Sequence, residues 1–490
     1  MLQSPVPHGL PGLALEISRD LTRLNYPPPD WVLPATGPDG KPRLDVLVVG
    51  GGMCGQTAAF ALIKNGIRNV RVIDRAARGQ EGPWANFARM PTLRSPKQLT
   101  GPDLGIPSLT FRAWFEARYG RDAWDALYKI ARLDWRDYLL WVRDTLALPI
   151  ENQVELTTLE PHGDWVQATL RSANGIETIQ ARKVVLALGR DGSGAPRWPT
   201  FSTWRPDRPR ARVHHAAEGI DFEQLRGARV AVLGAGATAF DNAGTALEAG
   251  ARELTLFARR PILPQVNKSK WASFPGFQRG FVALDDATRW GIFTYIFAEQ
   301  VPPPFESVER CDRHPGFSLL FDEPWLDLVE SSDGVVVKTP VTERHFDAVI
   351  VATGFDVDLT DRPELASFRD RISTWRDRVS AAQAGAHPEV ARFPYLDAGF
   401  GLIERAPDST TARAGLSNIH VFNWGSTLSH GQLAGDIPGL ETGALRLADA
   451  ITQALFVRDA DRYVEALHRF AEPELASTRY FISRSSPRTP

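Results

Sequence analysis

The sequence predicts an α/β protein with two separate βαβ units, and three observations lead to that fold class. Residues 44–74 and residues 228–260 each contain a short apolar segment, a glycine-rich turn, a helix of small residues and a second apolar segment. Apolar, β-branched runs of this length are typical of strands buried on both faces of a parallel sheet. The third observation is composition, since 490 residues with 43% hydrophobic and 23% charged side chains can form several domains with large cores.

Charge and cysteine usage exclude several classes of protein. Lys and Arg number 56 against 58 Asp and Glu, so the basic excess that nucleic-acid binding requires is missing. Cys54 and Cys311 are far apart in sequence, which excludes a disulfide scaffold, a multi-cysteine metal site and a C-x-x-C redox pair, and we expect no bound metal. No apolar run is long enough to cross a bilayer and the first residues lack a secretory pattern, so we expect a cytoplasmic protein without a membrane partner.

The N-terminal segment, residues 1–43, is rich in proline and precedes the first ordered strand. Proline interrupts both strand ladders and long helices, although LALEISRDLTRLN within this segment has helical spacing. We therefore expect an arm that lies across the surface of the main body.

The first glycine motif consists of Gly50, Gly52 and Gly55, directly after the strand LDVLVV and before the helix QTAAFALIKNG. In such a turn the glycines permit a tight bend, a close approach of the backbone to a diphosphate and close packing of the helix on the strand. Asp74 ends the second strand, where a carboxylate accepts hydrogen bonds from the ribose of an adenosine. This combination predicts a dinucleotide site suited to FAD.

The second motif consists of Gly234, Gly236 and Ala239, again between a strand and a helix. Its second strand ends with Arg259 and Arg260 in place of the acidic residue. Guanidinium groups bind a ribose 2′-phosphate that a carboxylate would repel, so we predict NADPH at this site. Two solvated surface arginines are the alternative interpretation.

The remaining segments complete the predicted organisation of the chain. Residues 109–148 are mostly helical, residues 270–297 form an aromatic-rich insertion, HFDAVIVATGF predicts another strand, and ETGALRLADAITQALF predicts an amphipathic helix. The predicted parts are a Pro-rich arm (1–43), a discontinuous FAD-binding domain (44–193 and 346–455), an NADPH-binding domain with the aromatic-rich insertion (194–345) and a C-terminal extension (456–490).

Several motifs resemble those of the class B flavin-dependent monooxygenases, a family with two dinucleotide-binding domains that includes Baeyer–Villiger, flavin-containing and N-hydroxylating enzymes. The resemblance covers most of residues 44–455. Gly82-Pro83-Trp84 is similar to the Gly-Gly-x-Trp segment of the family, and residues 187–189 (ALG) and 352–355 (ATGF, containing Thr353 and Gly354) are similar to its two A-T-G turns. In this family those turns mark the crossings between the domains, which implies that the FAD domain is discontinuous.

Other segments are similar to the N-hydroxylating branch. Residues 92–96 (TLRSP) and 137–142 (DYLLWV) resemble segments near the flavin and in the adjoining helix, and NWGSTLSHGQLAGD at 423–436 resembles the stretch that borders the flavin. The resemblance implies that Arg94 acts at the catalytic site and that Trp84 and Asp436 lie in the FAD site. It favours N-oxygenation slightly.

A histidine upstream of the second glycine motif, His214 or His215, corresponds to the family histidine that positions NADPH. The Baeyer–Villiger fingerprint around it is incomplete, because Arg208 and Arg210 occupy the expected Phe and Gly positions and no Trp follows. The resemblance therefore implies a catalytic role for His214 or His215, and the incomplete fingerprint weakens the assignment to ketone oxidation. On the residues alone, a surface or structural histidine is the alternative interpretation.

The resemblance implies that NADPH reduces FAD, that the reduced flavin and O₂ form a C4a-(hydro)peroxide, and that one oxygen atom enters a small organic substrate by N-, S- or Baeyer–Villiger oxygenation. The protein then supplies orientation and a dry environment, because the flavin carries the chemistry. Aromatic residues of the insertion are candidates for the walls of the substrate pocket, or for plain core: Trp271, Phe274, Phe277, Trp290, Phe293 and Tyr295.

Three alternatives share parts of this pattern. An NADPH-dependent flavin oxidase or dehydrogenase without oxygen insertion needs the same two nucleotide sites, so the sequence scarcely separates it from a monooxygenase. A pyridine-nucleotide disulfide oxidoreductase needs a redox-active cysteine pair that the sequence does not provide. A flavoprotein that acts only as a sensor would not need an NADPH site with two arginines. The sequence also leaves open whether the protein forms a homo-oligomer.

Overall fold

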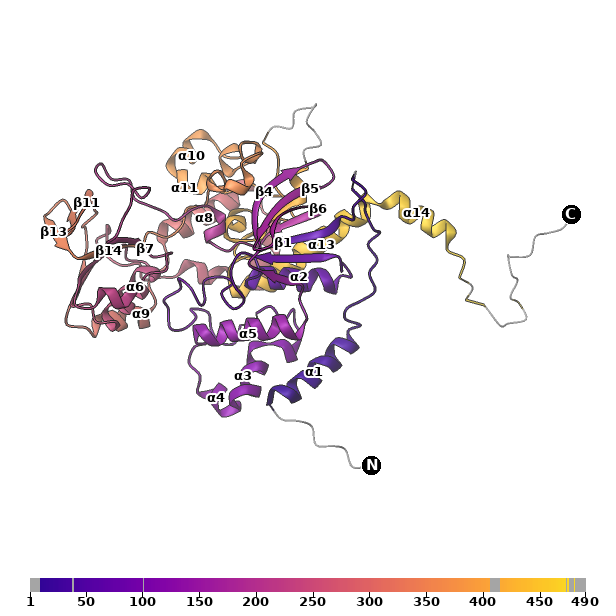
Figure 1. The fold of residues 1–490 in the computed structure, drawn as a ribbon, viewed down its shortest axis with the longest axis horizontal. Coiled ribbons are helices and arrows are strands. Elements are labelled where there is room, and N and C mark those ends of the chain that lie inside the picture. The colour runs from indigo at the N-terminus through magenta and orange to yellow at the C-terminus, as the bar shows by residue number, and fades with distance from the viewer. Residues whose placement is uncertain are drawn as a thin grey trace.

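A mixed sheet and a parallel sheet form the framework of the protein in a computed structural model, which describes residues 9–37, 39–99, 101–405, 415–472, 474, 475 and 480. In Figure 1 the first sheet lies at the centre and the second sheet lies at the left with α6 and α9. The helices are α1 (Gly9–Arg23), α2 (Met53–Lys64), α3 (Phe111–Tyr119), α4 (Arg121–Ala126), α5 (Arg132–Thr145), α6 (Ala237–Glu248), α7 (Pro275–Gly280), α8 (Asp286–Glu299), α9 (Phe305–Asp312), α10 (Ala381–Ala386), α11 (Pro388–Ala391), α12 (Thr427–His430), α13 (Leu440–Arg458) and α14 (Ala460–Arg469). Among the described residues no helix combines the length and apolar character needed to cross a bilayer.

The first sheet has the strand order β3-β2-β1-β6-β5-β4, with β15 pairing with β6. Its strands are β1 (Leu44–Val49), β2 (Val70–Asp74), β3 (Ile150–Asn152), β4 (Glu155–Pro161), β5 (Val166–Ser172), β6 (Gly175–Leu186) and β15 (Ile419–Val421). The strands β3, β2, β1, β6 and β15 pair in parallel, while β4, β5 and β6 form an antiparallel extension. The carboxyl ends of β1 and β6 therefore meet at one edge of the sheet.

Alternate residues of β1 enter two different cores. Val46 and Val48 pack with α1, α2, α3, α5 and α13, whereas Leu47 and Val49 pack with apolar residues of 359–372, 396–402 and 416–421. This burial on both faces explains the continuous apolar sequence of β1.

The second sheet has the order β10-β9-β8-β14-β7, and all of its pairs are parallel. Its strands are β7 (Val213–His215), β8 (Arg229–Leu233), β9 (Glu253–Phe257), β10 (Phe317–Leu320) and β14 (Ala348–Val351). Helices α6 and α9 pack on one face, and a small antiparallel sheet packs on the other, formed by β11 (Asp327–Ser331), β12 (Gly334–Lys338) and β13 (Glu343–Phe346). The expected boundary at residue 346 assigned β14 to the first nucleotide domain, but β14 pairs with β7 and β8 in the second sheet.

The N-terminal arm lies across the first domain. Helix α1 buries Leu13 and Ile17 in the core that α2 and α3 also share, and Trp31 donates a hydrogen bond from its indole nitrogen to Asn65 O at 2.7 Å. At the other end of the chain, α14 buries no side chain and extends away from the body in Figure 1. Residues 1–8 and 38 of the expected arm, and residues 473, 476–479 and 481–490 of the expected extension, lie outside the described residues.

Candidate functional site

The three glycines of the first glycine turn have different structural roles. Gly50 has φ +105°, and a Cβ placed there would lie 2.5 Å from the carbonyl oxygen of Ala187, so the fold itself requires glycine at this position. Gly55 packs against Gly50 O with no room for a side chain. Gly52 differs, because its φ is −73° and a Cβ there would lie 3.7 Å from the nearest protein atom. Only Gly52 leaves open space in front of the N-terminus of α2.

Asp74 stands beside this turn at the end of β2. One carboxylate oxygen accepts a hydrogen bond from Gly51 N at 2.7 Å, and the other accepts one from Ala76 N at 2.7 Å. Burial raises the pKa of Asp74, and the two amide donors partly offset that effect. Each carboxylate oxygen retains a further acceptor site, so the residue fits the ribose of a bound adenosine.

Trp84 approaches the turn from a following loop. Its ring lies next to Gly82, and the backbone of Gly82 is the nearest protein to the open face of Gly52. The predicted segment 82–84 therefore borders the space in front of α2.

In the second glycine turn, as in the first, one glycine is required by the fold and another faces open space. Gly234 has φ +118°, and a Cβ there would lie 2.7 Å from Ala352 O, whereas Gly236 has φ −84° and nothing within 4 Å of an added Cβ. Ala239 is fully buried in the first turn of α6, where its methyl group faces Gly234. Gly236, like Gly52, lies at the N-terminus of a helix with open space before it, as diphosphate binding requires.

Arg259 and Arg260 follow β9 at the carboxyl edge of the second sheet. Arg259 is exposed, and within the described part of the chain its side chain makes no hydrogen bond or ion pair. Arg260 is half-buried and donates a hydrogen bond to Ala298 O of α8 at 3.1 Å. The guanidinium of Arg259 is therefore available to a phosphate, whereas that of Arg260 already contacts the end of α8.

The chain crosses between the two sheets at two segments that pair with each other. Arg197 N donates to Gly354 O at 2.9 Å, and Asp356 N donates to Ala195 O at 2.9 Å. The hydroxyl group of Thr353 donates to Arg197 O, and Gly354 adopts φ +84°. Since Ala187 O and Ala352 O contact the two glycine turns, the A-T-G-like turns connect the nucleotide sites to the crossings.

His214 and His215 lie on β7 next to these crossings. His215 is buried with its ring centroid 4.9 Å from that of Trp198 and 6.2 Å from that of Phe355, and its Nδ1 accepts a hydrogen bond from Ala217 N at 3.2 Å. Its Nε2 is buried with no hydrogen-bond partner among the described residues. Burial lowers the pKa of both histidines and favours the neutral ring.

Arg94 lies at the interface of the two domains. Its guanidinium contacts the carboxylate of Asp241 in α6 at 3.0 Å, and the buried Asp241 also accepts a hydrogen bond from Ser307 at 2.6 Å. The predicted catalytic arginine thus joins the FAD-type unit to the helix of the second glycine turn, and its catalytic role stays a prediction.

Sequence reasoning missed one feature of the site, the contact between Arg190 and Trp424. The Arg190 guanidinium lies 3.6 Å from the centroid of the Trp424 ring. Asp436 is close enough to act electrostatically on Arg190, and so is Arg94. Burial raises the pKa of Asp436, opposed by these two arginines. The available sequence signal was an arginine directly after the ALG turn and a tryptophan directly after Asn423.

Three of the six candidate aromatic residues of the insertion pack as core and three do not. Phe277, Trp290 and Phe293 are buried with residues of 375–396, whereas Trp271, Phe274 and Tyr295 are exposed.

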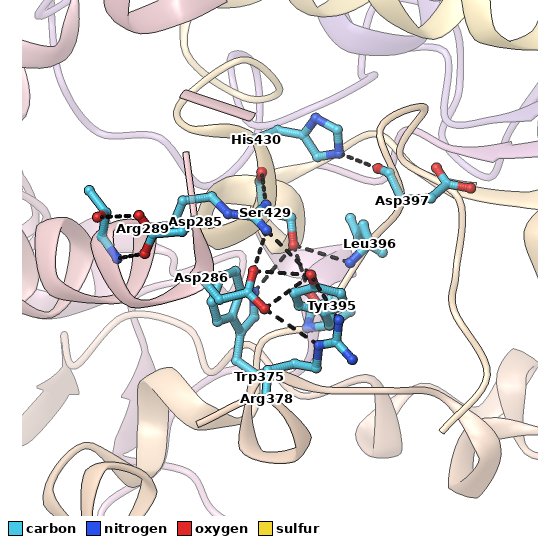
Figure 2. Close-up of polar contacts among 12 residues, drawn as sticks. Asp285, Asp286, Arg289, Trp375, Arg378, Tyr395, Leu396, Asp397, Ser429 and His430 are labelled. Carbon is cyan, nitrogen blue, oxygen red and sulfur yellow. Dashed lines mark hydrogen bonds and ion pairs between the residues drawn. The ribbon is translucent and has the colours of Figure 1, made fainter. Parts of the chain in front are cut away.

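A polar network anchors this insertion to the first domain. Figure 2 shows Arg289 of α8 between Asp286, Tyr395 and the α12 residue Ser429, with hydrogen bonds of 2.5 Å to Asp286, 3.3 Å to the Tyr395 hydroxyl and 3.0 Å to Ser429 O. The network holds α12, which begins three residues after Trp424, against α8.

Comparison with known proteins settles the family. Residues 47–273 match the family model described as pyridine nucleotide-disulphide oxidoreductase. The chain is 41% identical over 461 residues to the FAD-dependent urate hydroxylase of Xanthomonas campestris pv. campestris, covering 94% of this chain and 95% of that protein. The chain belongs to the class B flavin-dependent monooxygenases. As in that family, this flavoprotein monooxygenase has two nucleotide turns on two Rossmann-like sheets.

Solved structures share the fold of this monooxygenase. The ornithine N-hydroxylase of Kutzneria sp. 744 superposes with a TM-score of 0.64 at 16% identity, covering 84% of this chain and all (100%) of that one. The L-lysine 6-monooxygenase of Pseudomonas syringae superposes with a TM-score of 0.63 at 16% identity, with coverage of 84% and 100%.

The described part of this monooxygenase contains no cysteine pair that could carry out disulfide exchange. Cys54 and Cys311 are both free and buried in different domains, and the described residues contain no cluster of His, Cys, Asp or Glu able to hold a metal ion. Burial raises the pKa of each thiol to about 12, which leaves both cysteines protonated and unreactive. The family match over 47–273 therefore reflects the nucleotide-binding scaffold.

Proposed function

We propose that this monooxygenase binds FAD at the first glycine turn and NADPH at the second, and that it hydroxylates urate. The observation that carries the coenzyme assignment is the matched pair of open glycines, Gly52 and Gly236, each at a helix N-terminus beside a glycine that the fold itself requires. The 41% identity to a urate hydroxylase over nearly the full length of both chains supports the substrate.

The residues present fit both coenzymes. Gly52 and the N-terminus of α2 would hold the diphosphate of FAD, Asp74 its adenosine ribose, and Trp84 and Asp436 would border the rest of the molecule. At the second turn Gly236 would receive the diphosphate of NADPH. Arg259 and Arg260 would bind the 2′-phosphate.

Bound FAD would accept a hydride from NADPH and activate O₂, so that one oxygen atom enters urate as a hydroxyl group and the other leaves as water. The residues of the two glycine turns would hold the two coenzymes. Arg94 and Asp241 join the two nucleotide units, and we propose that the neutral His215 positions the crossing between them.

Purified protein reconstituted with FAD tests this proposal directly. We expect NADPH oxidation that depends on urate, with one O₂ consumed per NADPH and a urate product heavier by one oxygen atom. Product labelled from ¹⁸O₂ supports oxygen insertion. Urate-independent NADPH oxidation that yields only hydrogen peroxide would instead identify a flavin oxidase.

A further inference from the structure

Arg190 carries an unused hydrogen-bonding capacity. Among the described residues no hydrogen bond or ion pair is formed by its guanidinium, whose contact is the face of Trp424 at 3.6 Å. The side chain is exposed to solvent, yet surrounding protein desolvates it enough to lower its pKa. Because the residue is exposed and its guanidinium is unpaired, its N–H donors are available to a ligand.

The contact is preorganised by a buried network. The hydroxyl group of Ser193, three residues after Arg190, donates to Asn423 Oδ1 at 3.0 Å, and Asn423 Nδ2 donates to Leu186 O at 3.0 Å. Ser193 is 0% exposed and Asn423 is 1% exposed. Because Asn423 directly precedes Trp424, the network locks the Arg190 loop and the Trp424 loop together before any ligand binds.

The charged residues near Arg190 leave its guanidinium unpaired. Asp436 and Arg94 both act on Arg190 electrostatically, but among the described residues neither forms a hydrogen bond or ion pair with it, and Arg94 already has its own carboxylate partner in Asp241. The guanidinium of Arg190 lies over the indole ring of Trp424 and, being planar itself, presents its N–H donors in one plane. This geometry suits the edge of a planar anion with two adjacent acceptor atoms.

We propose that Arg190, which lies over the ring of Trp424, binds the anionic edge of the urate substrate and selects it over uncharged purines. This inference rests on the proposed function and assigns the recognition of urate to Arg190 and Trp424. The diphosphate of a coenzyme presents the same anionic chemistry, so the experiment separates these two sources.

The test uses FAD-loaded wild-type protein and the variants Arg190→Gln, Arg190→Lys and Trp424→Leu. FAD content is measured by absorbance, and the dissociation constants of urate and of hypoxanthine, an uncharged purine, are measured by calorimetry without NADPH. Loss of a charge-assisted, two-point contact should weaken urate binding about 10- to 100-fold in Arg190→Gln, with hypoxanthine binding and FAD content unchanged. Arg190→Lys keeps the positive charge but cannot donate two parallel hydrogen bonds, so we expect a loss of urate affinity between those of wild type and Arg190→Gln.

Arg43→Gln is the matched control. Arg43 directly precedes β1 and lies 4.9 Å from the ring of Trp165, which is in the turn between β4 and β5, and its loss should leave urate binding unchanged. Loss of FAD from Arg190→Gln would assign Arg190 to the coenzyme and overturn the proposal, and so would wild-type urate affinity in that variant. A wild-type protein that holds FAD and is reduced by NADPH but does not bind urate would refute the proposed substrate, and with it the Arg190 assignment, while leaving the coenzyme sites intact.

Discussion

Gly52→Ala separates a coenzyme site from a structural turn. At φ −73° alanine is unstrained, and its Cβ would lie 3.7 Å from the nearest protein atom, an ordinary van der Waals distance. The free energy of unfolding of the FAD-free protein should therefore change by about 1 kcal/mol or less, the usual difference between Gly and Ala at a helix N-cap. The methyl group would nevertheless occupy the space in front of α2 and disturb one or two hydrogen bonds to the charged diphosphate. At about 1.5–3 kcal/mol each, their loss weakens FAD binding at least about 10-fold.

The assay is a titration of FAD-free protein with FAD, followed by flavin fluorescence, together with urea unfolding of the same samples. Gly50→Ala is the control, because φ +105° and a Cβ 2.5 Å from Ala187 O make alanine destabilising by more than about 1–2 kcal/mol before any coenzyme is added. If Gly52→Ala binds FAD as tightly as wild type, or if it destabilises the FAD-free protein as much as Gly50→Ala does, the division of roles within the turn is wrong.

Three further predictions concern the second site, the insertion and the response to acid. Arg259→Ala removes an exposed guanidinium with no protein partner among the described residues, so KM for NADPH should rise while KM for NADH stays near its wild-type value; an equal rise for both coenzymes would contradict phosphate binding. Arg289→Met should lower the free energy of urea unfolding by about 1–3 kcal/mol, because Ser429 O loses its donor, and an unchanged free energy would show that the network in Figure 2 does not stabilise the insertion. Burial lowers the pKa of His430 to about 3 from 6.5, so the unfolded chain binds this proton first as the pH falls below 6.5, and unfolding becomes easier by about 1.4 kcal/mol per pH unit down to about pH 3. His430→Asn should flatten the dependence of unfolding free energy on pH between 6.5 and 5, and an unaltered slope would assign that dependence to other groups.

The sequence was sufficient for the two βαβ units because their signals are local. A buried strand, a glycine turn and a small-residue helix are adjacent in the chain, and the structure shows them at β1–α2–β2 and β8–α6–β9. The same locality explains why the end positions Asp74 and Arg259 were identifiable.

Long-range pairing decided what the sequence did not predict. The apolar run of β14 fits a buried parallel strand in either sheet, and only its hydrogen bonds to β7 and β8 assign it to the second. The contact of Arg190 with Trp424 depends on the Ser193–Asn423 hydrogen bond between segments 230 residues apart, which no local pattern encodes. For the same reason Phe277, Trp290 and Phe293 could be assigned to a pocket wall or to core only after the insertion was seen to pack on residues 375–396.

Anaerobic reduction of the FAD-loaded protein tests the central claim most directly. NADPH, added in increments without oxygen or substrate, should bleach the flavin absorbance completely at one equivalent, and NADH at the same concentration should reduce it far more slowly. A protein that cannot be loaded with FAD, or whose bound flavin stays oxidised in excess NADPH, would show that the two glycine turns do not hold an electron donor and its acceptor.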